Sequence, residues 1–229
     1  AKQMHMKPTI LAPPQTRRGT AVTAIHNVSQ QQNVSARTMA KYIRIHEYDA
    51  NVFPDFDGSE VVVSERFVMF WKPPCPFDQW TASEFSIDDV LYNCAEQYMM
   101  AEKARLFGDA ETEELILNSV SPSHQKKLGK RVEGFRDQLW SAERSNIVFR
   151  ANVAKFTQNP ELKEALLETG DRMLVEASPM DRIWGIGLAA NDPDAYHPDK
   201  WPGLNLLGNV LTDVRAHIKA GQQGAPVGG

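Results

Sequence analysis

The sequence NCAEQYMMAEKARLFGD, from Asn93 to Asp109, predicts a single helix that carries ionisable side chains. Asn93 is a residue type that favours the N-cap, and Gly108 suits the left-handed turn that ends many helices. Glu96 and Lys103 lie seven residues apart, so they share one stripe of the helix, about 10 Å apart along its axis. A carboxylate and an amine arranged in this way can flank one substrate.

Extended segments precede this helix. Residues 42–48 alternate between apolar and polar types, and residues 61–71 are rich in β-branched and aromatic side chains, as strands are. Residues 85–87 and 90–92 are predicted to be two further short strands. Between these segments, Pro73, Pro74 and Pro76 force a loop.

Downstream of Asp109 the pattern becomes helical. Helices are predicted at residues 109–118, 121–128, 137–156, 161–168 and 205–220, and residues 173–177 resemble the interior of a strand. Many helices, few strands and no βαβ alternation predict an α+β fold. We expect a compact, helix-rich single domain with a small, mainly antiparallel sheet.

Composition divides the chain into three parts. Residues 1–40 have few large apolar side chains, so we expect a flexible or loosely docked N-terminal arm, followed by a folded domain at 41–220 and a flexible tail at 221–229. The net charge of −4 excludes a chain-wide basic field for nucleic-acid backbones. A local basic arm remains, formed by Arg17, Arg18, Arg37, Lys41 and Arg44.

The chain has no apolar run long enough to span a membrane and no secretory pattern at its N-terminus. We therefore expect a soluble, intracellular protein, cytoplasmic or nuclear, with no membrane partner. His124, His197 and His217 stand alone without ligand spacing, so neither a metal nor another cofactor is implied. The Gly185-x-Gly187 pair also lacks the strand and helix of a dinucleotide-binding motif.

Two downstream positions have the character of site residues. Glu176 directly follows Leu174 and Val175, where a buried carboxylate is costly unless it is paired. It could mark an active site, or it could bridge helix termini or pair with Arg144. The segment 181–187 places an acid, a large ring and two glycines in a turn. That arrangement suits stacking of a base, although Trp184 could equally close a loop as a core residue.

The long helix at 137–156 carries Trp140, Arg144 and Lys155 on roughly one stripe. Most helix lysines are solvated, and a position near a helix C-terminus favours Lys155 through the macrodipole alone. The same reading applies to Lys103. Without further information, neither lysine is identified as functional.

Several motifs, taken in order, resemble those of the NADAR family over about Phe67 to Lys219. They are Cys94-Ala95-Glu96-Gln97-Tyr98 with Lys103-Ala104, Asn152-Val153-Ala154-Lys155-Phe156, Leu174-Val175-Glu176, Asp181 with Trp184-Gly185, and Gly203-Leu204-Asn205-Leu206-Leu207-Gly208. Each motif is weak alone, but the order and spacing make the set specific.

This resemblance implies a compact, helix-rich α+β fold and hydrolysis of N-glycosidic bonds. Carried over by motif, the residues expected to line the pocket are Glu96, Lys103, Lys155, Glu176, Asp181, Trp184 and Asn205. The chain departs from the family at Asp78-Gln79-Trp80, where Ser-Asn-Phe is frequent, and at Glu96-Gln97, where Glu-His is frequent. The second departure removes a possible proton carrier.

Cleavage of a ribose C1–N bond needs an acid near the departing base and an anion or nucleophile near C1. Glu96, Glu176 and Asp181 can supply these groups. A neutral lysine offers a second route, by capturing C1 as a Schiff base. We expect Lys155 to be this nucleophile, with Lys103 as its rival and with Arg144 as the cation that lowers the pKa of Lys155.

The resemblance implies two substrate classes: ADP-ribose attached to guanine, in a nucleotide or nucleic acid, and ribosylamino-pyrimidine phosphates of riboflavin synthesis. The basic arm favours the first. The expected substrate-binding residues are Trp80, Trp140 and Trp184 for stacking, Arg144 and Arg182 for the pyrophosphate, and Gln97, Gly185 and Asn205 around them. A non-catalytic module that binds ADP-ribose is the remaining alternative.

Overall fold

A computed structural model describes residues 43–45 and 57–223 of the chain. The expected arm at 1–40 lies outside these residues, and so do residues 224–229 of the expected tail. Within the described ranges, no helix is both long and apolar enough to cross a membrane.

A four-stranded sheet has the order β1-β2-β3-β6. Its strands are β1 (Ile43–Ile45), β2 (Val61–Val63), β3 (Phe67–Phe70) and β6 (Met173–Glu176). The expected strand at 61–71 is thus two strands, paired antiparallel through a short turn. A separate antiparallel hairpin joins β4 (Phe85–Ile87) to β5 (Val90–Tyr92), at the predicted positions.

The α+β class is confirmed, but the four-stranded sheet is mixed rather than mainly antiparallel. β1 pairs with β2, and β3 pairs with β6, in parallel register. The second pairing joins segments about 100 residues apart in the sequence, with Phe70 opposite Glu176. Long-range pairing of this kind is set by packing, so the local sequence did not reveal its direction.

Both faces of the sheet are covered. Val68 and Phe70 of β3 point into a core shared with the helices, while Phe67 and Met69 point into a second core. The second core is closed by Ile186, by the short helix η1 (Pro193–Tyr196) and by Trp201, which directly follows the short helix η2 (Pro198–Lys200). Burial on two sides explains why β3 is continuously apolar.

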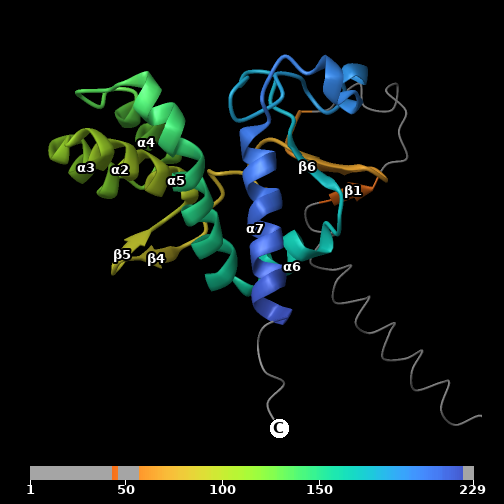
Figure 1. Cartoon of the computed structure of the whole chain (residues 1–229), viewed down its shortest axis with the longest axis horizontal. Helices are drawn as coiled ribbons and strands as arrows, with labels where there is room; N and C mark the ends of the chain where they lie inside the picture. Colours follow the sequence, from red (N-terminus) through yellow and green to blue (C-terminus); the bar gives the residue numbers. More distant parts are fainter. Residues whose placement is uncertain (1–42, 46–56, 224–229) are drawn as a thin grey trace, which may run out of the picture. The chain divides into compact units, whose positions relative to one another are not determined.

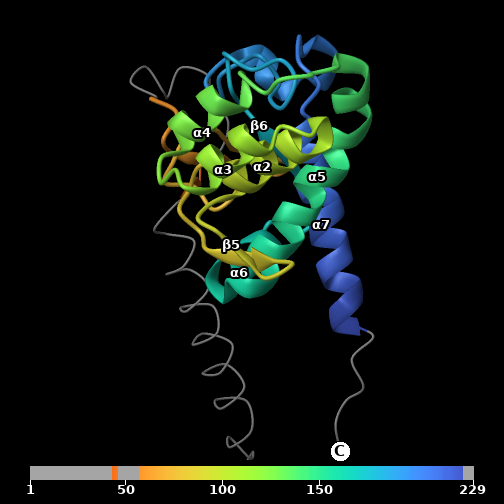
Figure 2. The same ribbon diagram turned by 90° about the vertical axis from the view of Figure 1, so that its left-hand side faces the viewer.

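The helices lie close to their predicted positions. They are α2 (Ala95–Phe107), α3 (Ala110–Leu117), α4 (Pro122–Gly129), α5 (Asp137–Gln158), α6 (Pro160–Glu168) and α7 (Leu206–Gln223). α2 packs against α3, α4 and α5, and α7 lies between α5 and β6 (Figures 1 and 2). α7 includes the first three residues of the expected tail.

The sequence predicts the last residue of α2 correctly but not its N-cap residue. Gly108 ends the helix in a left-handed conformation with φ of 75°, as predicted. At the start, Cys94 rather than Asn93 occupies the N-cap position. The Asn93 side chain instead donates to the Ser119 carbonyl and accepts from the Gln125 amide, so long-range hydrogen bonds take precedence over the local cap.

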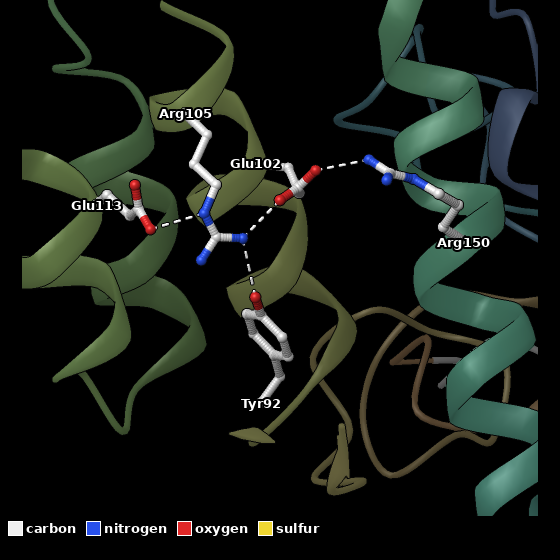
Figure 3. A network of polar contacts seen from close by, with 5 residues as sticks. All are labelled: Tyr92, Glu102, Arg105, Glu113 and Arg150. Carbon is white, nitrogen blue, oxygen red and sulfur yellow. Dashed lines mark hydrogen bonds and ion pairs between the residues drawn. The ribbon is translucent and has the colours of Figure 1, made fainter. Parts of the chain in front are cut away.

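A polar network fixes the outer side of α2 (Figure 3). The Arg105 guanidinium contacts Glu102 at 2.5 Å, Glu113 at 2.7 Å and the Tyr92 hydroxyl at 2.9 Å. Glu102 also pairs with Arg150 of α5 at 2.6 Å. The network connects α2 to α3, α5 and the hairpin, and so holds the helix that carries Glu96.

Asn205 completes the outer edge of β6. It has φ of 52°, a left-handed conformation that asparagine tolerates well. Its side chain accepts from the Glu176 N–H at 3.0 Å and donates to the Leu174 carbonyl at 3.0 Å. The amide thereby occupies the place of a neighbouring strand and fixes the backbone of Glu176. A Cβ at Gly208 would lie 2.1 Å from the same Leu174 carbonyl, so α7 packs directly on this edge.

We predict that Asn205→Ala lowers the free energy of unfolding by about 2 kcal/mol, because it leaves the part-buried Glu176 N–H and the buried Leu174 carbonyl unpaired. Chemical denaturation measures the change. Asn209→Ala is the matched control, since the Asn209 side chain is exposed and makes one long hydrogen bond of 3.4 Å. Equal, small losses in the two variants would contradict the role given to Asn205.

Candidate active site

A cavity of about 700 Å³ opens between α2, α4, α5 and the loops around residues 71–80 and 178–184. Three kinds of functional side chain line it. They are the acids Asp78, Glu96, Glu176 and Asp181, the lysines Lys72, Lys103, Lys126 and Lys130, and the tryptophans Trp71, Trp80, Trp140 and Trp184. No group of three or more His, Cys, Asp or Glu among the described residues could hold a metal ion.

Glu96 enters the cavity from the first turn of α2. The residue is 2% exposed, and its Oε1 has no hydrogen-bond partner among the described residues. Burial raises the pKa of Glu96 to about 7, and the charges of Asp181 and Asp78 act in the same direction. Lys126 and the Trp80 side chain oppose this shift. Glu96 can therefore exchange a proton near neutral pH.

Glu176 reaches the cavity from the end of β6. Asn205 and β3 fix its backbone, and its Oε2 is buried without a hydrogen-bond partner among the described residues. Burial, followed by the charge of Asp181, raises the pKa of Glu176 to about 8. The carboxyl group thus keeps its proton at neutral pH, which is the form a general acid needs.

Asp181 begins the turn that brings Trp184 to the cavity. Its Oδ1 accepts from the backbone N–H groups of Ile183 and Trp184, both at 2.8 Å. Gly185 is needed behind this turn, because a Cβ there would lie 2.8 Å from the Glu176 carbonyl oxygen and 2.9 Å from that of Asp181. Gly185 therefore supports the site without lining the cavity.

Lys103 and Lys155 differ in access to the cavity. Lys103 lines it, with its Nζ donating to the Gly129 carbonyl at 2.7 Å and lying 4.3 Å from the centre of the Phe135 ring. Lys155 is 0% exposed and does not line the cavity; its Nζ donates to the Asp78 carbonyl at 2.8 Å. Lys103 therefore lines the cavity, whereas Lys155 is buried beside the backbone of Asp78.

Burial lowers the pKa of both lysines, although Glu96 raises that of Lys103 and Asp78 raises that of Lys155. Arg144 is not among the charges that shift the pKa of Lys155, contrary to expectation. Its Nε is buried without a hydrogen-bond partner among the described residues, and Arg144 does not line the cavity.

Only some of the expected substrate-binding residues line the cavity. Trp80, Trp140 and Trp184 line the cavity, whereas Gln97, Arg182 and Asn205 do not. Gln97 is buried, and its Nε2 donates to carbonyls at the end of α3 while its Oε1 accepts from the Asn93 N–H. Arg182 is exposed. Gln97 and Asn205 therefore hold backbone in place.

Sequence reasoning did not select Asp78 or the lysines of α4. Asp78 is 3% exposed; its carboxylate accepts from the N–H groups of Trp80 and Thr81 and from the Thr81 hydroxyl. Burial raises its pKa. An Asp followed after three residues by Thr is a turn signal that could have identified it. Lys126 and Lys130 lie four residues apart, a spacing that places both on one helix face.

These side chains are suited to cleaving a bond between a sugar and a base. Two carboxyl groups with raised pKa values can give and take protons, and the tryptophans offer flat surfaces for rings. Lys103 adds an amine whose charged form is disfavoured by burial.

Comparison with known proteins agrees with this chemistry. The NADAR domain model matches residues 67–219. The N-glycosidase R617 of Acanthamoeba polyphaga mimivirus is 48% identical over 144 residues, covering 61% of this chain and 85% of the viral protein. Further relatives from Nostoc punctiforme and Shigella are also named N-glycosidases.

Two other similarities concern pathway and fold. The chloroplastic riboflavin biosynthesis protein PYRR of Zea mays is 29% identical over 138 residues, covering 57% of this chain and 20% of the maize protein. The NMR structure of the Escherichia coli protein YbiA has a TM-score of 0.59 at 24% identity, and the match covers 72% of this chain and 92% of YbiA. That likeness supports the fold.

The expectation that rested on the motifs is thus confirmed at the level of family and enzyme class. The chain belongs to the NADAR family and is a glycosidase of the N-glycosidase type.

Proposed function

We propose that the enzyme hydrolyses the bond between ribose C1 and nitrogen in ADP-ribose attached to guanine, as a nucleotide or within nucleic acid. The observation that carries this proposal is the placement of Glu96 and Glu176, both with raised pKa values, in one cavity lined by four tryptophans. A cavity of about 700 Å³ has room for a ligand of nucleotide size.

Glu176 has the properties of the general acid. Its pKa of about 8 exceeds that of Glu96, so Glu176 is the group that keeps its proton at neutral pH. That proton passes to the departing guanine nitrogen. Glu96 is more readily ionised, because Lys126 and Trp80 lower its pKa, and its carboxylate stabilises positive charge that develops on the sugar.

Lys103 is the preferred nucleophile for a covalent route. When the ribose ring opens, the proton on the guanine nitrogen moves to the ring oxygen and C1 forms an imine with that nitrogen. The neutral Lys103 amine adds to C1 and one of its protons passes to the guanine nitrogen, which gives an aminal. Glu176 then gives the guanine nitrogen a second proton and takes back the remaining proton of the lysine nitrogen, as the bond from C1 to guanine breaks and an imine between C1 and Lys103 forms. Water then hydrolyses the resulting imine, releasing the sugar and restoring the amine. Lys103 takes this role from Lys155, since Lys103 lines the cavity and Lys155 does not.

A second substrate class is the ribosylamino-pyrimidine phosphates of riboflavin synthesis. The similarity to the maize riboflavin protein favours it, and the same bond is cleaved. This substrate is smaller and would leave more of the cavity and its tryptophans unoccupied. The larger ADP-ribosyl substrate uses the lining more fully and is therefore preferred.

Incubation with ADP-ribosylated guanosine and borohydride tests both the substrate and the nucleophile. We expect release of ADP-ribose without borohydride, and with it a covalent adduct that peptide mapping assigns to Lys103. Lys103→Arg should abolish the adduct, because arginine keeps the charge but remains protonated. In Lys155→Arg the adduct should persist in whatever fraction of the protein folds.

Each alternative outcome has a definite meaning. An adduct on Lys155 would overturn the assignment of Lys103, whereas turnover without any adduct would exclude the covalent route. Turnover of the ribosylamino-pyrimidine phosphate alone would replace the proposed substrate. No turnover of either compound would contradict the proposed function.

The pH profile of kcat/KM tests the roles of the two carboxyl groups. Activity should fall below pH about 7, where Glu96 gains a proton, and above pH about 8, where Glu176 loses one. Asp181→Asn should move the alkaline limb to lower pH, because the Asp181 charge raises the pKa of Glu176. The asparagine keeps an oxygen for the two N–H groups of the turn. An alkaline limb that does not move would contradict the role of Glu176.

A further inference from the structure

The cavity contains four acids, yet the proposed substrate is itself an anion. Asp78, Glu96, Glu176 and Asp181 all line the cavity, and the charges of Asp78 and Asp181 raise the pKa values of Glu96 and Glu176. A diphosphate entering this space would be repelled unless cations lie close to its binding position. The lysines that line the cavity are the candidates for these cations.

α4 presents two of these lysines to the cavity. Lys126 lies in its last turn and Lys130 is its C-cap residue, four positions later, so the two are about 6 Å apart along the axis on one face. The helix sequence, PSHQKKLG, contains no acid that could neutralise them. Lys127 belongs to the same turn but is exposed and does not line the cavity.

The four lining lysines differ in what their amines already contact. The Lys72 Nζ donates to the Asp57 carbonyl at 2.7 Å, and the Lys103 Nζ donates to the Gly129 carbonyl at 2.7 Å. In the described part of the chain, the amines of Lys126 and Lys130 have no hydrogen bond and no ion pair. Lys126 lies 5.7 Å from the centre of the Trp80 ring. These two amines are available to a ligand.

We propose that Lys126 and Lys130 bind the diphosphate of the substrate at the mouth of the cavity, with Trp80 beside them for a ring of the same ligand. Two neighbouring ammonium groups match a ligand that carries charge on two linked phosphoryl groups, whereas a single phosphate needs only one of them. The assignment rests on the proposed function and makes it more specific, since it selects a nucleoside-diphosphate sugar over a sugar monophosphate.

Lys126 has a second role that Lys130 lacks. Its charge lowers the pKa values of both Glu96 and Glu176, and Lys130 does not appear among the charges that act on either carboxyl group. Loss of Lys126 should therefore weaken binding and also move both limbs of the pH profile to higher pH. Loss of Lys130 should raise KM and leave the limbs in place.

Calorimetric titration of the full chain tests the proposal without any need for turnover. The probes are inorganic pyrophosphate, ADP-ribose and ribose 5-phosphate, and the variants are Lys126→Gln, Lys130→Gln and, as the matched control, Lys127→Gln. We expect Lys126→Gln and Lys130→Gln each to weaken binding of ADP-ribose and pyrophosphate about 10-fold, the loss typical of one charged hydrogen bond. Binding of ribose 5-phosphate should weaken by less than about threefold.

The control variant, Lys127→Gln, should bind all three probes as the unaltered protein does, and Lys130→Arg should restore most of the affinity. Equal losses for ADP-ribose and ribose 5-phosphate would overturn the diphosphate assignment. A loss in Lys127→Gln as large as that in Lys130→Gln, or no binding of pyrophosphate and ADP-ribose by the unaltered protein, would overturn the site. Tight binding through these lysines without cleavage would contradict the proposed function alone.

Discussion

The cost of burying several acids around one cavity is the constraint on which the site depends. Glu96 and Glu176 come from different elements, the start of α2 and the end of β6, and each has a buried oxygen without a hydrogen-bond partner among the described residues. Water would stabilise their charged forms, but burial and mutual repulsion favour the protonated forms. The fold thus holds two carboxyl groups that can exchange protons near neutral pH, and burying them lowers the free energy of unfolding.

The surrounding structure holds these acids in place. Asn205 fixes the backbone of Glu176, and the network around Arg105 anchors α2 on the side away from the cavity. The turn begun by Asp181 places its own carboxylate and the Trp184 ring at the same wall. α4 adds lysines to the same cavity, which therefore combines the acids proposed for the reaction with the cations proposed for an anionic ligand.

The sequence predicts the elements that depend on nearby residues, but it does not predict the contacts between distant segments. The hairpin at 85–92, the cap at Gly108 and most helix ends depend on nearby residues, and they were placed correctly. The parallel pairing of β3 with β6 depends on packing between distant segments. The resemblance to the family implies Lys155 as a site residue, but Lys155 is buried, donates to the Asp78 carbonyl and does not line the cavity. Lys126 belongs to none of the sequence motifs, and only the fold places it at the cavity.

Titration of the carboxyl carbons by ¹³C NMR tests the central claim most directly. In protein labelled at glutamate carboxyl carbons, Glu96→Gln and Glu176→Gln assign the two signals of interest. We expect one group to titrate at about pH 7 and the other at about pH 8, far above the exposed glutamates of the same chain. Titration of both groups near pH 4.5, the ordinary value, would contradict the account.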